Sequence, residues 1–474
     1  MIVIEVGNIR SQILGPLTVA TLGKLNAKLS YELPGAEFAQ LHNPWAGTKY
    51  LFSKITQSFP TGLIHYVENI LTKEGIQYQV LDKRSPIPLG PPITVHNLKL
   101  YEFQLDAVKK AIERQRGIIK VGTGGGKTCI AIEIIAKLNV PTLILIHKTD
   151  VFWQLIHRLE ESFKIPIGRI GDGDLDIQRI TVGMIQTISQ AFTLKNFQPK
   201  HQVIRQFVES CNCLITDECH HCPAKSFLDV HKRAKNTLFK FGLSASPWRE
   251  DNADLLIEAY HAKQIVDISA SWLIDHGYLV PPVLYRYKFK HERKPRSNFE
   301  YPKIYDTEVV YNIERNKVIV ESALKAAKVG KTVLIAITKI EHGRILETML
   351  QTVDPEALFV FGESESEQRK RTLKELNERK RKIVICTTIF GEGIDVPNLD
   401  VLVNAKAGGS SVDAFQLIGR VLRRGEQKSK AYIIDIADEQ CKYLGAHSNS
   451  RLKIYKTEPR YEIQEIISVE DLKF

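Results

Sequence analysis

Apolar residues recur along most of this chain in two alternating patterns: short continuous runs, and longer stretches with helical spacing. Gly117–Val121 has the length and composition of a buried strand, and Cys129–Leu138 has apolar residues at helical spacing. The same alternation extends over residues 96–248. Strands that alternate with helices form a parallel sheet covered on both faces, so we expect an α/β lobe over this range.

A second lobe of the same kind is expected over residues 313–474, with a connector over residues 249–312 between the two. The apolar runs of the second lobe predict strands at Thr332–Ile337, Ala357–Phe361, Ile383–Thr387, Val401–Asn404 and Ala431–Ile436. The fold class is therefore α/β, with two parallel-sheet lobes.

The connector contains a run, Tyr285–His291, in which basic and aromatic residues alternate. Basic side chains interleaved with aromatic rings can bind phosphates and stack on bases. The same alternation also suits an edge strand with two different faces. The sequence leaves both interpretations open.

Residues 1–95 lack the regular alternation of the two lobes and predict a small α+β domain. The expected elements are strands at Ile2–Val6, Lys49–Ile55 and Gln77–Leu81, and helices at Leu17–Leu29 and Thr61–Lys73. The proline-rich segment Ser85–Pro92 cannot continue a helix or a central strand, so it is expected to be a stiff linker.

Composition indicates an ordinary globular protein, with 43% hydrophobic and 25% charged residues. No apolar run reaches the roughly 20 residues that span a bilayer, and the N-terminus lacks a basic-then-apolar signal pattern. We therefore expect a cytoplasmic protein without a membrane partner. The formal charge of +11 favours a polyanionic partner, most simply a nucleic acid.

Seven cysteines in a long chain without a signal pattern are expected to be reduced thiols. A dense group of thiols and imidazoles could hold zinc: Cys211, Cys213, Cys219, His220, His221 and Cys222. However, two successive C-x-x-C pairs are missing, and the first two cysteines begin a predicted strand. Whether these cysteines bind zinc stays open.

A glycine-rich segment joins the predicted strand Gly117–Val121 to the helix that follows. Its residues are Gly122, Thr123, Gly124, Gly125, Gly126, Lys127 and Thr128. Glycines let successive backbone N–H groups face a phosphate, and the helix N-terminus adds partial positive charge. In such a loop the lysine reaches the β- and γ-phosphates and the threonine hydroxyl ligates Mg²⁺. The segment predicts binding of a nucleoside triphosphate, although Val121 occupies the first glycine position of the full motif.

Two adjacent carboxylates, Asp217 and Glu218, follow the apolar run Leu214–Thr216. In a parallel α/β sheet, ligands gather at the carboxyl ends of the strands. We therefore expect Asp217 to hold Mg²⁺ together with Thr128. Glu218 is expected to orient and deprotonate the water that attacks the γ-phosphate.

The order of these motifs resembles the helicases and translocases of superfamily 2, from Leu100 to Arg424. The segments that carry the resemblance are Asp217–His220, Ser244–Ser246, Leu143–His147 with Gln154, Thr181–Thr187, Thr387–Pro397 and Gln416–Arg423. Within the superfamily, the chain is most similar to the XPB-like group and to the phage UvsW-type branched-DNA helicases. The segments that suggest this group are Ser58–Leu63, Asp82–Arg84, Asp217–His221 and Ser246–Arg249.

The resemblance implies two RecA-like lobes with ATP and Mg²⁺ between them. It implies that Arg420 and Arg423 are arginine fingers, whose planar donors suit a phosphoryl transition state. Gln104 corresponds to a glutamine that reads adenine. The further nucleotide-binding positions that it implies are Gly393, Asp395 and Gln416.

The expected function is that of a monomeric DNA-dependent ATPase that remodels branched DNA such as forks and junctions by branch migration or fork regression. Its DNA contacts are expected to be largely independent of sequence. Three alternatives share these motifs: an RNA helicase, a restriction-type translocase subunit that acts on duplex DNA, and an ATP-gated DNA-binding clamp without turnover. The intact catalytic set argues against the clamp.

Overall fold

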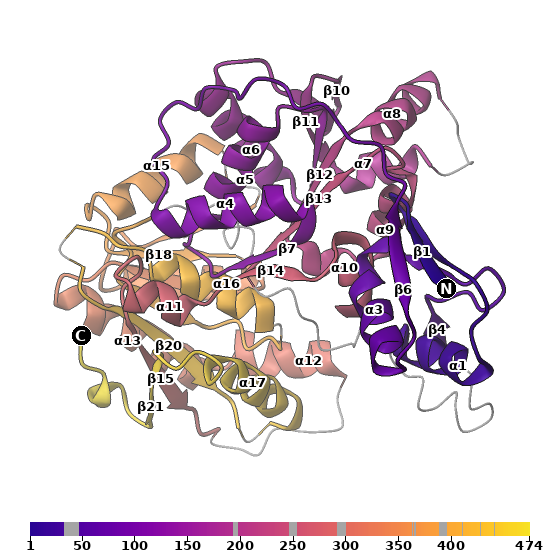
Figure 1. The fold of residues 1–474 in the computed structure, drawn as a ribbon. Helices are drawn as coiled ribbons and strands as arrows, with labels where there is room; N and C mark the ends of the chain where they lie inside the picture. Colours follow the sequence, from indigo (N-terminus) through magenta and orange to yellow (C-terminus); the bar gives the residue numbers. More distant parts are fainter. Residues whose placement is uncertain are drawn as a thin grey trace. The chain divides into compact units, whose positions relative to one another are not determined.

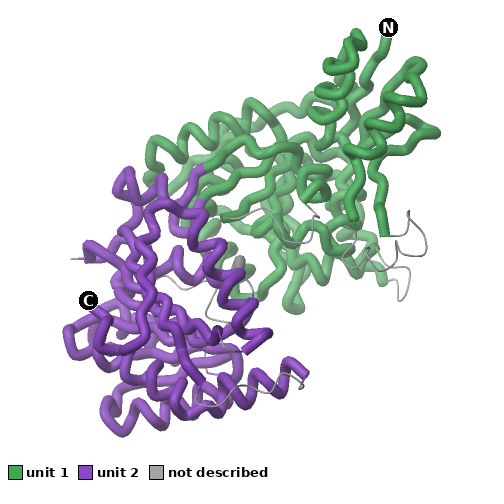
Figure 2. Tube along the Cα trace, turned by 90° about the horizontal axis from the view of Figure 1, so that it is seen from below, with its two compact units in different colours: residues 1–121, 126–267 green, residues 122–125, 268–474 purple. Residues whose placement is uncertain are grey.

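The computed structural model describes most of the chain, in two compact units. The described residues are 1–32, 47–192, 198–245, 254–291, 300–362, 364, 366–387, 396–409, 411–426, 428–439 and 441–474. The first unit comprises residues 1–121 and 126–267, and the second comprises residues 122–125 and 268–474 (Figure 2).

An eight-stranded sheet forms the core of the first unit, in the order β10-β9-β11-β8-β12-β13-β7-β14 (Figure 1). Its strands are β7 (Arg116–Val121), β8 (Thr142–Ile146), β9 (Gly168–Gly171), β10 (Asp174–Asp176), β11 (Ile180–Met184), β12 (Cys213–Asp217), β13 (Phe239–Ser244) and β14 (Gln264–Ile268). From β9 to β7 the neighbouring strands pair in parallel. The central strand β8 is buried along its whole length, as expected where helices cover both faces of a sheet.

The helices before and between these strands confirm the predicted alternation. They are α4 (Glu102–Arg114), α5 (Lys127–Leu138), α6 (Thr149–Phe163), α7 (Ile185–Gln190), α8 (Pro199–Ser210), α9 (Lys225–Arg233) and α10 (Asp254–His261). In α5 the isoleucines at helical spacing are buried and Lys137, in the last turn, is exposed.

The second unit contains a fully parallel seven-stranded sheet, in the order β17-β18-β16-β19-β20-β15-β21. Its strands are β15 (Pro282–Lys288), β16 (Val333–Ala336), β17 (Leu358–Val360), β18 (Ile383–Cys386), β19 (Val401–Asn404), β20 (Ala431–Ala437) and β21 (Glu462–Ile466). Its helices are α11 (Ala270–Asp275), α12 (Tyr301–Tyr305), α13 (Ile313–Lys328), α14 (Ile340–Gln351), α15 (Ser366–Asn377), α16 (Ser411–Val421) and α17 (Lys442–Tyr455). All five strands predicted for this lobe are present.

The segment expected to connect the lobes contributes a strand to each sheet. β14 lies at the end of the first sheet, and β15 lies between β20 and β21 in the second. The edge-strand interpretation of Tyr285–His291 is therefore wrong, because β15 is paired on both sides. Tyr285 and Tyr287 are buried in the core of the second unit, and Arg286 lies 2.6 Å from the Glu439 carboxylate. Packing and ion pairing thus account for the alternation.

Within residues 1–82, the described residues (1–32 and 47–82) form a four-stranded sheet, in the order β5-β2-β1-β6, with two helices and a two-stranded ribbon. The elements are β1 (Ile2–Val6), β2 (Arg10–Leu14), α1 (Val19–Lys28), β3 (Ser30–Glu32), β4 (Thr48–Tyr50), β5 (Ser58–Pro60), α3 (Ile64–Lys73) and β6 (Tyr78–Asp82). The prediction was correct for β1 and β6 and for helices α1 and α3, but it missed β2, β3 and β5. The strand predicted at Lys49–Ile55 is shorter than expected and ends at Tyr50.

This N-terminal segment packs into the first lobe. The buried Arg116 guanidinium, on β7, donates hydrogen bonds to the Asn8 carbonyl at 2.7 Å and to Asn8 Oδ1 at 2.9 Å. Gly62 is needed for close packing, because a Cβ there would stand 2.0 Å from the Glu258 carbonyl oxygen on α10. Phe59 and Leu63 belong to the same buried cluster as residues of the first lobe. Residues 1–82 and the first lobe therefore share one core.

Among the described residues, no helix combines the length and the apolar character that a membrane span requires.

Candidate functional site

The glycine-rich loop has the backbone that a phosphate cradle needs. β7 ends at Val121 and α5 begins at Lys127. Between them, Gly124 and Gly126 have φ angles of +90° and +83°, a region that residues with a Cβ rarely adopt. The Gly125 N–H donates to the Gly122 carbonyl at 2.9 Å, which closes a tight turn. The loop thus leads directly into a helix N-terminus, where backbone N–H groups favour an anion.

Gln104 lies against this loop from α4. It is buried, and a Cβ on Gly126 would stand 2.4 Å from its Nε2 atom. Its Oε1 atom accepts a hydrogen bond of 2.9 Å from the Tyr101 N–H, as part of a capping box at the start of α4. The capping bond fixes the orientation of the amide, so the predicted adenine-reading side chain stands beside the phosphate loop.

The two predicted carboxylates lie at the carboxyl end of β12. Asp217 is the last residue of the strand, and Glu218 follows it with φ +47° and ψ +57°. A left-handed conformation costs a non-glycine residue of order 1–3 kcal/mol, and such conformations cluster at functional sites. It turns the Glu218 side chain toward α5, where its Oε1 atom lies 3.5 Å from Lys127 Nζ.

Three further groups surround the Glu218 carboxylate. Its Oε2 atom lies 3.4 Å from His220 Nδ1 and accepts a hydrogen bond of 3.4 Å from the Ser244 hydroxyl at the end of β13. Ser244 Oγ in turn lies 3.2 Å from His220 Nδ1. The strand ends β12 and β13 and the start of α5 therefore bring together Lys127, Glu218 and Ser244, three residues that the sequence placed in separate motifs.

Charge keeps this carboxylate ionised. Burial raises the pKa of Glu218, but the Lys127 ammonium, together with His220 and His221, lowers it by more. The net pKa lies below its usual value, so Glu218 is a carboxylate at neutral pH. A general base must be unprotonated before it accepts a proton, and Glu218 meets that requirement.

Sequence reasoning missed a histidine pair beside this site. The His221 ring centroid lies 4.2 Å from that of His147, after β8, and 4.2 Å from that of His220. Burial, and then the neighbouring His221, lower the pKa of His147 to about 3, so its imidazole is neutral. The Gln186 side chain donates a hydrogen bond of 2.8 Å to the His147 carbonyl, which links two motifs that resemble strand-contact segments. In the sequence, the doublet His220–His221 directly after the two carboxylates was the feature that could have indicated histidines at this site.

Buried neutral histidines predict that the protein loses stability in mild acid. Burial lowers the pKa values of His147 and His342 to about 3, against about 6.5 in the unfolded chain. Between pH 6.5 and 4 the unfolded chain therefore binds more protons, and stability falls as the pH is lowered through this window. Each histidine contributes up to about 1.4 kcal/mol per pH unit.

Thermal unfolding at pH 7, 6 and 5 measures this loss as a falling midpoint. His342→Gln, at a site away from the phosphate loop, should flatten the dependence. His157, whose side chain is 70% exposed, is the matched control, and His157→Gln should not change it. A midpoint that is constant from pH 7 to 5 in the original chain would contradict the prediction.

In the second unit, Gln416 and Arg420 lie one turn apart on α16 and Arg423 follows the helix. Residues spaced by three or four positions share a helix face. Gln416 is buried, and Arg420 and Arg423 are partly exposed. Gly393 and Asp395, the other predicted positions in this lobe, lie outside the described residues, as does Ser246.

The described structure does not gather the predicted zinc group into one place. The Cys211 thiol lies 3.4 Å from the Thr237 hydroxyl in the core, and Cys213 is buried at the start of β12. His220 and His221 belong to the carboxylate site described above.

Two family models match the chain. Residues 97–249 match the family described as "Type III restriction enzyme, res subunit", and residues 314–425 match "Helicase conserved C-terminal domain". The first match contains the phosphate loop and the carboxylates, and the second contains Arg420 and Arg423. These paired domains, with one largely parallel sheet in each lobe, define the chain as a superfamily 2 helicase, an ATP-dependent enzyme with two RecA-like lobes.

Similar curated proteins come from viruses and archaea. "Putative helicase 22" of Sulfolobus islandicus filamentous virus is 26% identical over 372 residues, which are 73% of this chain and 65% of the relative, so the chain spans slightly less than two thirds of that protein. "DNA 3'-5' translocase XPB2" of Sulfurisphaera tokodaii is 23% identical over 389 residues, which are 73% of this chain and 83% of the relative. "ATP-dependent DNA helicase uvsW" of Enterobacteria phage T4 is 26% identical over 459 residues, which are 88% of this chain and 87% of the relative. The predicted likeness to XPB and UvsW proteins is thus confirmed.

Proposed function

We propose that this enzyme is a DNA translocase that uses ATP hydrolysis to remodel branched DNA. The observation that carries the proposal is the extent of the similarity to the phage protein named uvsW. It covers 88% of this chain, against 73% for the other two relatives. The packing of residues 1–82 into the first lobe supports the proposal, because a DNA-holding segment that shares a core with the motor moves together with it.

The proposed roles at the nucleotide follow from the geometry of the first unit. Lys127 neutralises the β- and γ-phosphates, and Thr128 and Asp217 hold Mg²⁺. Glu218, held as a carboxylate by Lys127, orients and deprotonates the attacking water. Gln104 reads adenine from its place beside Gly126.

In this proposal, the second lobe supplies the side chains that bind the γ-phosphate during hydrolysis. Arg420 and Arg423 donate to it in the transition state. Gly393, Asp395 and Gln416 complete the nucleotide site. The bound Mg-ATP supplies the phosphoryl group whose transfer to water drives the lobes through their cycle. DNA is held through its phosphates, so binding should be salt-sensitive and largely independent of sequence.

Branch migration should be faster than unwinding of a simple tailed duplex. Each branch-migration step exchanges one base pair for another, whereas unwinding must overcome roughly 1.4 kcal/mol of stacking per step. Initial ATP-dependent rates on a mobile four-way junction and on a tailed duplex, at equal salt and saturating enzyme, test this. We expect the junction to be processed at least about fivefold faster. Equal or faster unwinding of the tailed duplex would exclude the remodelling role and leave a general helicase.

A second candidate is a translocase on unbranched duplex DNA, favoured by the match of residues 97–249 to a restriction-enzyme family. Steady-state ATP hydrolysis with linear duplex, four-way junction and RNA duplex at equal nucleotide concentration separates the two. Stimulation by linear duplex equal to that by the junction favours the second candidate. Stimulation by RNA alone would contradict both.

A further inference from the structure

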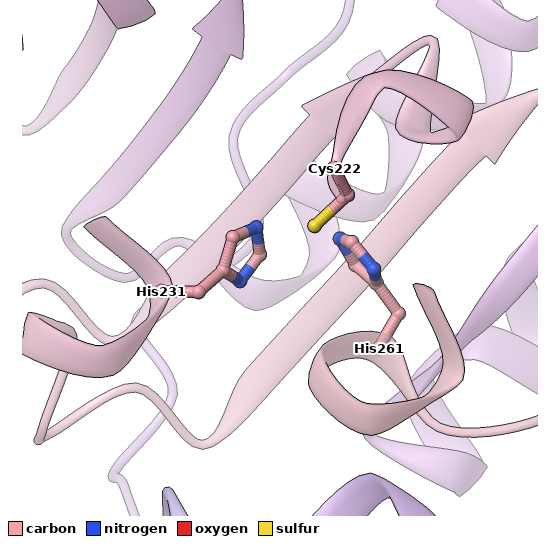
Figure 3. A group of neighbouring side chains, drawn as sticks. All are labelled: Cys222, His231 and His261. Atoms are coloured by element: carbon pink, nitrogen blue, oxygen red, sulfur yellow. The ribbon is translucent and has the colours of Figure 1, made fainter. Parts of the chain in front are cut away.

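A buried thiol and two buried imidazoles meet inside the first unit. Cys222, His231 and His261 each offer one ligand atom, and these three atoms lie within 4.8 Å of one another. Figure 3 shows the three side chains pointing toward one another from separate segments. Cys222 follows a 3-10 turn, Cys219–His221, whereas His231 lies near the end of α9 and His261 ends α10. All three side chains are inaccessible to solvent.

Hydrogen bonds orient the two rings around one hydroxyl group. His261 Nδ1 lies 3.1 Å from the Ile257 carbonyl, which can only accept, so Nδ1 carries the proton and Nε2 presents its lone pair. Metal-binding histidines are oriented in this way, by a carbonyl that accepts from the other ring nitrogen. The Thr216 hydroxyl lies 3.0 Å from His261 Nε2 and 3.1 Å from His231 Nε2. The Thr216 hydroxyl donates only one proton, so it can donate to His261 Nε2 while it accepts from His231 Nε2–H. His231 Nδ1 is buried without a hydrogen-bond partner, so the proton can move to Nδ1 and free the Nε2 lone pair for a metal ion.

The electrostatic environment does not oppose a cation there. Burial lowers the pKa values of both imidazoles, that of His261 to about 4, so both rings are in the neutral form that binds metals. Lys240 lies next to the group and donates a hydrogen bond of 3.4 Å to the His231 carbonyl. Burial, and then the neighbouring Arg116, lower the pKa of Lys240 well below its usual value, which favours its neutral amine.

A second thiol lies beside the same group. A Cβ on Gly242 would stand 2.9 Å from Cys219 Sγ and 3.1 Å from His261 Cγ, so these two atoms border the same point of β13. Cys219 is fully buried, like Cys222. Two thiolates would balance the two charges of a divalent ion, which matters because an unpaired charge is costly to bury.

Sulfur and imidazole ligands select zinc among the common divalent ions, since Mg²⁺ and Ca²⁺ prefer oxygen. We propose that Cys222, His231 and His261 bind a structural zinc ion inside the first lobe, with Cys219 as the fourth ligand. At Zn–S and Zn–N distances of about 2.3 Å and 2.0 Å, the ligand atoms of Cys222, His231 and His261 need to close by roughly 1 Å. Cys219 lies outside this group of three and would have to turn toward it.

The ion would link α9, α10 and the 3-10 turn Cys219–His221 beside the nucleotide site. Thr216, between the two imidazoles, is the residue before Asp217 on β12, and Cys219 directly follows Glu218. Binding to a site present only in the folded state stabilises the fold, so zinc should hold the end of β12 against α9 and α10. The proposal is independent of which nucleic acid the enzyme uses.

Zinc content of the full-length protein, purified without chelator and measured by mass spectrometry of the elements, is the first test. We expect about one zinc per chain, and less than about one tenth of that in Cys222→Ala. The matched control is Cys213→Ala, which removes an equally buried thiol on β12 outside the group and should retain the metal. A wild-type protein without zinc, or equal zinc in both variants, would overturn the proposal.

A second measurement covers the case in which Cys222→Ala does not fold. Cobalt should replace zinc in the original chain and give the charge-transfer and visible absorption bands of a tetrahedral thiolate site. A zinc chelator, without nucleotide present, should lower the thermal midpoint, and added Zn²⁺ should restore it. A cobalt spectrum without thiolate bands, or a midpoint that the chelator leaves unchanged, would also overturn the proposal.

Discussion

Replacement of Glu218 by glutamine is expected to slow ATP hydrolysis by about 10²–10⁴-fold, the range that a positioned general base contributes. Glutamine keeps the size of the side chain and can still accept from the Ser244 hydroxyl, but it cannot take a proton from water. ATP binding should remain or strengthen, because Lys127 loses the carboxylate that lies 3.5 Å from its ammonium. Phosphate release measures the turnover, and titration with a fluorescent nucleotide measures the binding.

A matched control is available on α5. Glu133 pairs with Lys137 at 3.7 Å and lies away from β12, so Glu133→Gln should keep turnover within about twofold. Lys127→Ala should lose both binding and turnover, since the ammonium interacts with the phosphates in the ground state and in the transition state. Near-wild-type turnover in Glu218→Gln would show that another group activates the water.

The two α/β lobes could be predicted from the sequence because the strand, turn and helix that form the phosphate loop follow one another directly along the chain. A buried strand, a glycine-rich turn and a helix are contiguous from Gly117 to Leu138, and each follows from short-range pattern. Parallel-sheet topology then places strand ends at one edge, so Asp217 was expected near Lys127 although 90 residues separate them along the chain.

Features that depend on tertiary packing were not predictable in this way. The alternation in Tyr285–His291 fits any strand with two different faces, and only the pairing of β15 with β20 and β21 shows that it is internal. The sequence likewise predicted a boundary at Ser85–Pro92. It gave no signal that Arg116, beyond that boundary, is buried against Asn8. Stiff segments mark a change in local structure, but they do not show whether the flanking parts share a core.

The cysteine and histidine group shows the same limit. Spacing along the chain drew attention to six residues between Cys211 and Cys222. The fold disperses Cys211 and Cys213 and instead places Cys222 beside His231 and His261, which come from two later helices. Ligands that converge from separate elements have no short sequence signature, so only the structure reveals them.

Alanine at Arg420 or at Arg423 is expected to reduce hydrolysis by roughly 10³–10⁵-fold, the effect of arginine fingers in phosphoryl transfer generally. Arg420 follows Gln416 by one turn near the end of α16, Arg423 lies two residues beyond the helix, and both side chains are partly exposed. An exposed arginine that served only in surface ion pairs would contribute under about 1 kcal/mol to stability and nothing to turnover. The thermal midpoint should therefore stay nearly constant while hydrolysis is lost.

The adjacent Arg424 is the control for this prediction. Its guanidinium is exposed and donates a hydrogen bond of 2.7 Å to the Gly277 carbonyl within the same unit, so Arg424→Ala should keep hydrolysis within a few-fold. Nucleotide binding distinguishes a finger from a binding residue, because a group that acts mainly in the transition state lowers kcat with little change in affinity. Wild-type turnover with a lowered midpoint in Arg420→Ala and Arg423→Ala would assign both arginines to structure and leave the γ-phosphate without a partner from the second lobe.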